Sequence, residues 1–206
     1  RLTFCQSQGP RCYRPLNFWC EQHLAVARPE LSCSPVDGIE TDDDAREGRI
    51  RDAVRRLQIM RTPREQAFDD LVVLASQVSR TPVAAITIID DDRLWFKASI
   101  GLPWDEILRS ESLCATAIES DRTFVCNDLS TTSPYSSNQL VVGHPFIGAY
   151  IAVPLHCPDG TPIGTLAVGD SDPRVFSGEQ ISLLEAVGRQ VEQLFALRIT
   201  LNLSLI

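Results

Sequence analysis

The sequence predicts a mixed α+β domain, and three observations support this class. Two pairs of β-branched, apolar segments are each joined by a short polar turn, the pattern of antiparallel hairpins. Amphipathic helical segments precede and follow these pairs, and hairpins with helices on one face define an α+β domain. The chain has 206 residues, 44% of them hydrophobic and 22% charged, which is enough apolar material for a core.

The first 40 residues are expected to form a poorly ordered extension, because they are rich in Pro, Cys, Ser and Arg and show no sustained periodicity. An N-terminal helix is predicted within 41–61, with its strongest signal over 43–60. Acidic residues open it, where they face the positive end of the helix dipole. Its apolar residues follow the helical spacing of three and four: Ile50, Ala53, Val54 and Leu57.

A second helix is predicted over 63–79. Thr62 is a candidate N-cap, Pro63 suits the first helical position, and Glu65 completes a capping-box pattern. Thr81-Pro82 is expected to end this helix.

The pattern then changes to strands. A hairpin is predicted from 83–89 and 94–100, joined by a run of three aspartates, and a second from 149–155 and 163–168, joined around Pro158-Asp159-Gly160. A short helix over 112–120 and a short strand over 123–126 are predicted between them. Residues 127–147 are expected to form a long loop, and such loops are often binding loops.

The last helix opens with a second capping-box pattern, Ser177 to Gln180. An apolar seam with spacings of three and four follows, with one polar break: Leu184, Val187, Val191, Leu194, Arg198, Leu201 and Leu205. This seam favours pairing with a helix outside the domain. The alternative is an amphipathic helix that covers one sheet face.

Charge and composition exclude several classes of protein. The net charge of −8 argues against nucleic acid as a partner, and no apolar run is long enough to span a bilayer, so membrane insertion is not expected. The seven cysteines are an odd number and scattered, and no secretory signal is recognisable. A cytoplasmic protein with reduced thiols is therefore expected.

Several separate motifs over 62–195 occur in the order seen in one family, and the chain resembles a GAF domain. They are Thr62-Pro63, Ala67-Phe68-Asp69, Ile89-Asp90, Arg93-Leu94-Trp95-Phe96-Lys97, Ser112-Leu113-Cys114-Ala115, Ala117-Ile118, Tyr150, Pro154-Leu155, Pro158-Asp159-Gly160 and Gly164-Thr165-Leu166. The resemblance is to the type found at the N-terminus of bacterial sensor histidine kinases and diguanylate cyclases.

This resemblance implies a six-stranded antiparallel sheet with helices on one face, a ligand pocket on the other (GAF/PAS-like) and long terminal helices. Such domains sense a small molecule and signal through terminal helices that commonly dimerise, so a homodimer is expected and 196–206 would start a signalling helix. The chain itself is not expected to be an enzyme, and a histidine kinase or diguanylate cyclase output would lie outside it, as in a two-component system. The alternative is a dimerising adaptor that binds no ligand.

Seven residues are candidates for ligand binding, on the pattern of an apolar wall with a few polar groups. They are Trp95, Phe96, Cys114, Asp128, Tyr135, Asn138 and Tyr150. Because side chains alternate along a strand, at most one of the adjacent Trp95 and Phe96 can face the pocket. The ligand and any cofactor are unknown from sequence, and no metal site is predicted.

Three specific chemistries of relatives are disfavoured. In bilin-binding relatives a histidine accompanies the cysteine, but Ala115 and Thr116 follow Cys114 here. Relatives that reduce free methionine sulfoxide need an attacking thiolate and a resolving thiol, and the residues around Cys126 and Cys157 do not match their pattern. The signature of cyclic-nucleotide-binding relatives is not recognisable. A zinc site from the early Cys and His residues is also disfavoured, because their spacing does not fit.

Overall fold

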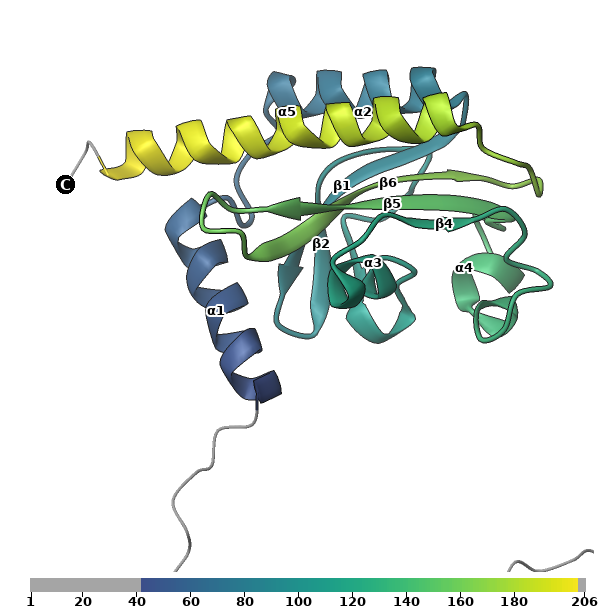
Figure 1. Cartoon of the computed structure of the whole chain (residues 1–206), viewed down its shortest axis with the longest axis horizontal. Coiled ribbons are helices and arrows are strands. Elements are labelled where there is room, and N and C mark those ends of the chain that lie inside the picture. Colours follow the sequence, from purple (N-terminus) through teal and green to yellow (C-terminus); the bar gives the residue numbers. More distant parts are fainter. Residues whose placement is uncertain (1–41, 204–206) are drawn as a thin grey trace, which may run out of the picture. The chain divides into compact units, whose positions relative to one another are not determined.

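A six-stranded antiparallel sheet organises residues 42–203, the part of the chain that the computed structural model describes (Figure 1). The strand order is β3-β2-β1-β6-β5-β4. The strands are β1 (Val83–Asp90), β2 (Arg93–Ile100), β3 (Glu106–Leu108), β4 (Phe124–Cys126), β5 (Ala149–His156) and β6 (Pro162–Asp170). The helices are α1 (Asp42–Leu57), α2 (Gln66–Ser79), α3 (Ala115–Ser120), α4 (Gln139–Val142) and α5 (Gly178–Leu203), with 3-10 turns at Arg109–Glu111 and Tyr135–Ser137.

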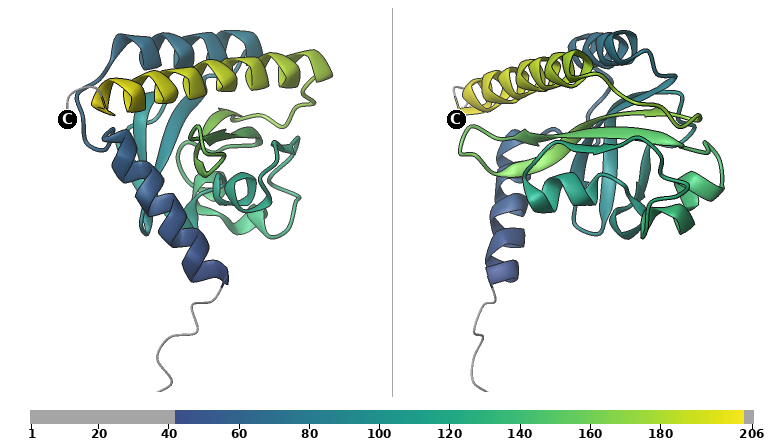
Figure 2. Two further views of the ribbon diagram at one scale, coloured as in Figure 1. Left: turned by 60° about the vertical axis from the view of Figure 1, so that its left-hand side comes forward. Right: turned by 45° about the vertical axis from the view of Figure 1, so that its right-hand side comes forward.

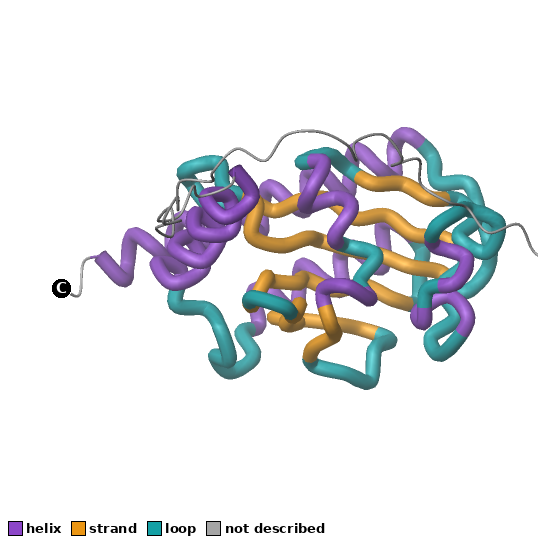
Figure 3. Tube along the Cα trace, turned by 90° about the horizontal axis from the view of Figure 1, so that it is seen from below, coloured by secondary structure: helices purple, strands orange, loops and turns teal. Residues whose placement is uncertain are grey.

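The two faces of the sheet are covered differently. Helices α2 and α5 lie side by side on one face (Figures 1 and 2). The short helices α3 and α4 and their connecting segments cross the strands on the other face (Figure 3). The predicted class, an antiparallel six-stranded sheet with helices, is confirmed.

Strand β1 lies at the centre and pairs with β2 on one side and β6 on the other. Its residues from Ala84 to Ile89 are all buried, which explains why this segment is apolar on both of its faces. Gly164 of β6 lies so close to β1 that a Cβ there would meet the carbonyl oxygen of Thr87. Beside it, the hydroxyl groups of Thr87 and Thr165 are 2.9 Å apart, so these two buried polar groups satisfy each other.

Helices α2 and α5 pack on the sheet and on each other through large apolar residues. The rings of Phe68 and Phe195 lie 6.0 Å apart between centroids, and both side chains are buried. The capping box predicted for α5 is confirmed: the Gln180 amide donates to Ser177 Oγ (3.1 Å), and the Ser177 amide donates to Gln180 Oε1 (3.0 Å).

The capping box predicted for α2 is wrong. The helix begins at Gln66, and the Glu65 side chain caps no backbone amide. Thr62 instead donates its hydroxyl hydrogen to the Ile59 carbonyl. The Glu65 carboxylate is occupied by ion pairs with two cations from β2 and α5, and it therefore does not reach back along its own chain.

The apolar seam predicted along α5 serves mainly the domain itself, so its assignment to an external helix is wrong for the first half. Leu184, Val187 and Val191 are buried in the core, as the alternative of a helix covering one sheet face predicts. Arg198, the polar break, contacts residues of the same domain. Leu201 is exposed, and Leu205 lies outside the described residues.

One strand and one α-helix were not predicted from the sequence. Strand β3 has only three residues, too few to show a period of two. Helix α4 lies inside the expected long loop, where the Asn138 side chain accepts a hydrogen bond from the Leu140 amide as an N-cap. The expectations for residues 1–40 lie outside the described residues. Within 42–203, no helix is both long enough and apolar enough to cross a membrane.

Helix α1, predicted from its apolar spacing, packs its buried face against the domain. Polar contacts also join α1 to the segment that covers the sheet face opposite α2 and α5. Arg109 forms a two-pronged ion pair with Glu47, both distances being 2.8 Å, and Arg46 donates to the carbonyl of Ile118 in α3 (2.8 Å). The described part of α1 exposes no large apolar side chain.

His156, at the end of β5, lies between two acidic residues from opposite layers. Its Nδ1 is 2.6 Å from Glu192 Oε1 on α5, and its Nε2 is 2.6 Å from Asp121 Oδ1 at the end of α3. The hydrogen bond to Glu192, followed by the bond and charge of Asp121, raises the pKa of His156 to about 9 against partial burial. The imidazolium therefore links α3 to α5 at neutral pH.

We expect this link to make folding stability depend on pH between about 6.5 and 9. Because the folded pKa lies above the unfolded value of about 6.5, the stabilisation is complete below that pH and is lost as the pH rises through 9. Replacing His156→Asn should remove on the order of 2 kcal/mol at pH 6 and little at pH 9.5. Urea unfolding at a series of pH values measures this.

His144→Asn is the matched control, because the His144 ring contacts the aromatic rings of Trp104 and Phe146. This variant should keep the wild-type slope between pH 6.5 and 9. A wild-type unfolding free energy that does not fall over this range would contradict the assignment.

Candidate functional site

An apolar cavity of about 40 Å³ lies on the sheet face opposite α2 and α5. Its floor consists of strand residues whose side chains point away from α2 and α5. Along each strand they alternate with residues whose side chains lie beneath these helices. The floor includes Val83, Ala85, Thr87, Phe96, Tyr150 and Ala167. The roof comes from segments 102–114 and 140–147, and includes Leu102, Trp104, Ile107, Leu113, Leu140 and Ile147. Among the described residues, no charged side chain lines the cavity.

The cavity is small in this state. A single water needs about 10–15 Å³ on a comparable scale, so only a few water-sized groups fit. Trp104, Ile107 and Leu140 also line a wider surface hollow of about 430 Å³ that contains charged residues. The hollow and the cavity therefore share part of the roof.

Cys114 and Tyr150 form the polar contact within the cavity. Cys114 precedes α3, Tyr150 lies on β5, and the thiol sulfur is 2.9 Å from the phenol oxygen. Burial, with a smaller effect of Cys114, raises the pKa of Tyr150 well above its usual value. The phenol is therefore a neutral group that can donate or accept one hydrogen bond.

The structure brings three of the seven candidate residues to the cavity: Phe96, Cys114 and Tyr150. Trp95 pairs with Ile88 and lies on the face covered by the helices, where Lys97 Nζ is 5.8 Å from its ring centroid. The alternation expected for Trp95 and Phe96 is thus present, with Phe96 on the cavity side. Whether these residues bind a ligand remains a prediction.

The three candidates from the long loop hold that segment in place and do not line the cavity. The Tyr135 hydroxyl is 2.9 Å from Thr116 Oγ1 of α3. Asn138 caps α4 and donates to the carbonyl of Glu111 (2.8 Å). Asp128 is partly exposed at the surface and accepts hydrogen bonds from the amide and hydroxyl of Ser130.

Trp104 and most apolar residues of the roof were not predicted as site residues, because they lie in segments 101–111 and 127–147, for which the sequence shows no strand or helix periodicity. The one signal that could have found Trp104 is a large aromatic directly after Pro103, in a stretch without strand or helix periodicity.

The three described cysteines are free and buried. Cys126 Sγ lies 3.5 Å from Thr132 Oγ1, and Cys157 Sγ lies 3.9 Å from the carbonyl of Ala53. Burial raises the pKa of Cys157 to about 11, which keeps this thiol protonated at neutral pH. Within 42–203, no cluster of three or more His, Cys, Asp or Glu residues is arranged to hold a metal ion.

Relatives in sequence point to one family. The family model described as GAF domain matches residues 63–195. A cyclic di-GMP phosphodiesterase of Pseudomonas aeruginosa is 33% identical over 139 residues, which cover 67% of this chain and 24% of the relative. This chain therefore corresponds to about a quarter of that protein's length.

Solved structures share the fold. The GAF domain of an Acinetobacter phosphoenolpyruvate-protein phosphotransferase has a TM-score of 0.55 at 18% identity, with 74% of this chain and 93% of that one covered. A putative GAF sensor protein of Burkholderia vietnamiensis gives 0.53 at 20% identity, with 77% and 98% covered. A free methionine-R-sulfoxide reductase of Neisseria meningitidis gives 0.54 at 15% identity, with 75% and 89% covered. With the matched fold and the family model over most of its length, this chain belongs to the GAF domain family.

Proposed function

We propose that this chain is a regulatory GAF domain of a bacterial signal-transduction protein, which binds a small, largely apolar molecule in the cavity beneath the sheet. The observation that carries the proposal is the largely apolar lining around the Cys114–Tyr150 pair. An apolar lining with a few polar groups is typical of small-molecule sites. A cytoplasmic location is part of this proposal.

The lining favours an uncharged ligand. A phosphate group in the cavity would need cationic partners, and the described lining offers none. A nucleotide is therefore a poor fit, although the curated relative is a cyclic di-GMP phosphodiesterase.

Contacts around the roof supply a route from the cavity to the terminal helices. Displacing the roof would move α3, which Arg46 ties to α1. It would also move Asp121, which His156 ties to Glu192 on α5. Ligand binding would in this way bias the positions of both helices. This requires that the ligand binds one arrangement of the helices more tightly than the other.

We also propose a homodimer through a surface that differs from the one predicted by sequence. Large apolar side chains are exposed on α2 and α5, which pack against each other: Val73, Leu74, Leu183, Leu197 and Leu201. A second copy of the chain would cover this surface by two-fold pairing. At about 1.5 Å per residue, the 26 residues of helix α5 extend over roughly 39 Å.

We expect an uncharged, largely apolar compound to raise the melting temperature by roughly 5 °C or more at about a hundred times its Kd. A thermal-shift screen with nucleotides, amino acids, tetrapyrroles and small aromatics measures this. Ala85→Leu, which fills the cavity floor, should abolish the shift, whereas Val175→Glu on the surface should keep it.

A screen without any shift would contradict ligand binding, provided that native mass spectrometry finds only the bare polypeptide. Higher stability of Ala85→Leu without ligand would agree with that outcome. The result would favour the alternative, a dimerising adaptor.

We expect no reduction of free methionine-R-sulfoxide by this chain with a thiol reductant. That chemistry needs an attacking thiolate and a resolving thiol, and Cys157 is held protonated by burial. The assay follows loss of the sulfoxide over time. Turnover that Cys114→Ser abolishes would overturn the non-catalytic assignment.

We expect Leu197→Glu to convert the dimer to a monomer, because it places a charge among the exposed apolar side chains that would pair. Val175→Glu is the matched control, since Val175 is exposed but precedes α5. Sedimentation velocity measures the species present. A wild-type chain that stays monomeric at its highest soluble concentration would rule out the dimer.

A further inference from the structure

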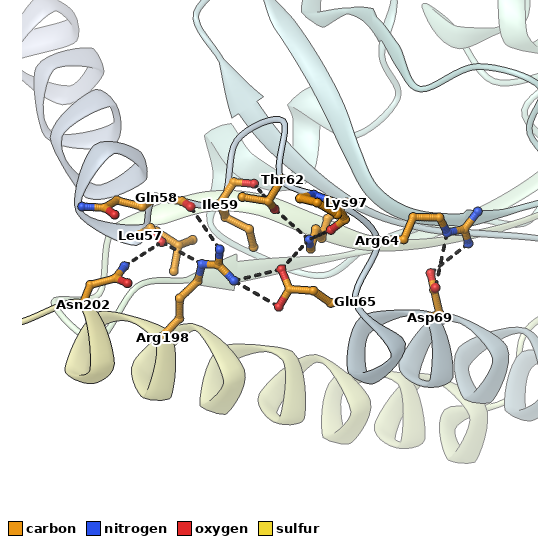
Figure 4. Close-up of polar contacts among 11 residues, drawn as sticks. Leu57, Gln58, Ile59, Thr62, Arg64, Glu65, Asp69, Lys97, Arg198 and Asn202 are labelled. Atoms are coloured by element: carbon orange, nitrogen blue, oxygen red, sulfur yellow. Dashed lines mark hydrogen bonds and ion pairs between the residues drawn. The ribbon is translucent and has the colours of Figure 1, made fainter. Parts of the chain in front are cut away.

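Lys97 is the single lysine of the chain, and its side chain has no exposed surface. It is the extra residue of a β-bulge, where Ile86 pairs with Ala98 and Thr87 pairs with Phe96. Its side chain lies on the same face as that of Trp95, two residues earlier in the strand. Here the ammonium group points into the helix-covered layer (Figure 4).

Three acceptors surround this ammonium group. They are Thr62 Oγ1 at 2.8 Å, the Pro63 carbonyl at 2.8 Å and Glu65 Oε1 at 2.6 Å. An ammonium group has three hydrogens to donate, so Lys97 is fully satisfied. All three acceptors belong to the segment between α1 and α2. The buried charge of Lys97 therefore attaches this segment to β2.

Glu65 also binds a second cation. Arg198 Nη1 on α5 lies 2.9 Å from Oε1 and 3.0 Å from Oε2 of the same carboxylate. Partial burial opposes ionisation of Glu65, but the hydrogen bond and charge of Lys97, together with Arg198, lower its pKa below the usual value. Because Oε1 accepts from both cations, a shift of either one changes the geometry of the other contact.

Arg198 extends the network to the end of α1. Its Nε donates to the carbonyl of Leu57 (3.0 Å), and its Nη2 donates to the carbonyl of Gln58 (3.1 Å). Asn202 Nδ2 donates to the Leu57 carbonyl as well (3.3 Å). These carbonyls lie at the C-terminal end of a helix, where they lack intrahelical partners, so α5 provides the cap of α1.

The strand that carries Lys97 also forms part of the cavity. Phe96, the preceding residue, lines the cavity on the opposite face. Any movement of β2 that accompanies a change in the cavity floor therefore reaches the ammonium group directly.

We propose that Lys97, Glu65 and Arg198 form a latch that couples the cavity strand β2 to the last turns of α5 and the end of α1. The latch rests on the proposed function, since it explains how occupancy of the cavity would reach the helices from the floor. With Lys97 in place, Glu65 holds Arg198, and Arg198 holds the end of α1. Displacement of Lys97 loosens both terminal helices together.

Hydrogen–deuterium exchange of the full chain without ligand tests the latch. Lys97→Met removes the charge but keeps an apolar side chain, and Lys97 itself contacts no residue of α5 among its hydrogen-bond partners. We expect exchange in peptides covering 196–203 and 55–62 to accelerate about tenfold or more. Peptides from β5 report global unfolding and should change less.

Two matched variants separate a latch from general loosening. Glu65→Gln should act like Lys97→Met, and it carries the test if the lysine variant does not fold. Arg56→Gln removes another ion pair at the end of α1, to Asp159 of the β5–β6 turn, and should leave exchange in 196–203 unchanged. Faster exchange with Arg56→Gln as well would overturn the latch, and so would unchanged exchange with Lys97→Met and Glu65→Gln.

The connection to the cavity is tested from its own side. Phe96→Leu should accelerate exchange in 196–203 in the wild-type background and add nothing in an Arg198→Gln background, where the latch is already open. An equal effect in both backgrounds, or none in either, would overturn the coupling. Both measurements use the chain without ligand, so they do not depend on ligand binding. If the variants respond as expected but no ligand is found, the proposed function is overturned and the latch stands.

Discussion

Strand β1 must be apolar on both faces, because helices cover one side of it and the cavity roof covers the other. The pairing with β6 needs Gly164 against the Thr87 carbonyl, and the pairing with β2 contains a bulge at Lys97, whose side chain points toward the helices. Consecutive residues of the same strands therefore serve two different layers. A packing change on one face is consequently felt on the other.

The polar contacts of the domain join layers that its apolar core keeps apart. His156 connects the end of α3 with α5, whereas Lys97 connects strand β2 with α5 through Glu65. The two connections reach α5 at different places, near Glu192 and at Arg198. An occupant of the cavity could act on the same helix through both its roof and its floor.

Local patterns predicted most of the fold. Both hairpins, the α5 capping box and the apolar spacing of α1 depend on residues close together in sequence, and the structure contains all of them. The network around Lys97 could not be predicted in this way, because its partners lie 32 to 35 residues away, and Glu65 and Arg198 are 133 residues apart. The only local sign of this network in the sequence is the capping-box pattern from Thr62 to Glu65, which does not form a capping box in the structure.

The candidate site was predicted in part, for a similar reason. Phe96 and Tyr150 lie on strands, where alternation decides which face they occupy, and they line the cavity. Tyr135 and Asn138 lie in a segment that folds into short turns and uses its polar groups to hold itself together. The sequence of this segment therefore does not show whether a polar side chain points toward the cavity or away from it.

Burial of the single lysine has a chemical consequence for the whole chain. Every other basic side chain, histidine aside, is a guanidinium, and Lys97 is enclosed by Thr62, Pro63 and Glu65. No side-chain amine is thus open to acetylation, methylation or ubiquitin attachment in the folded domain.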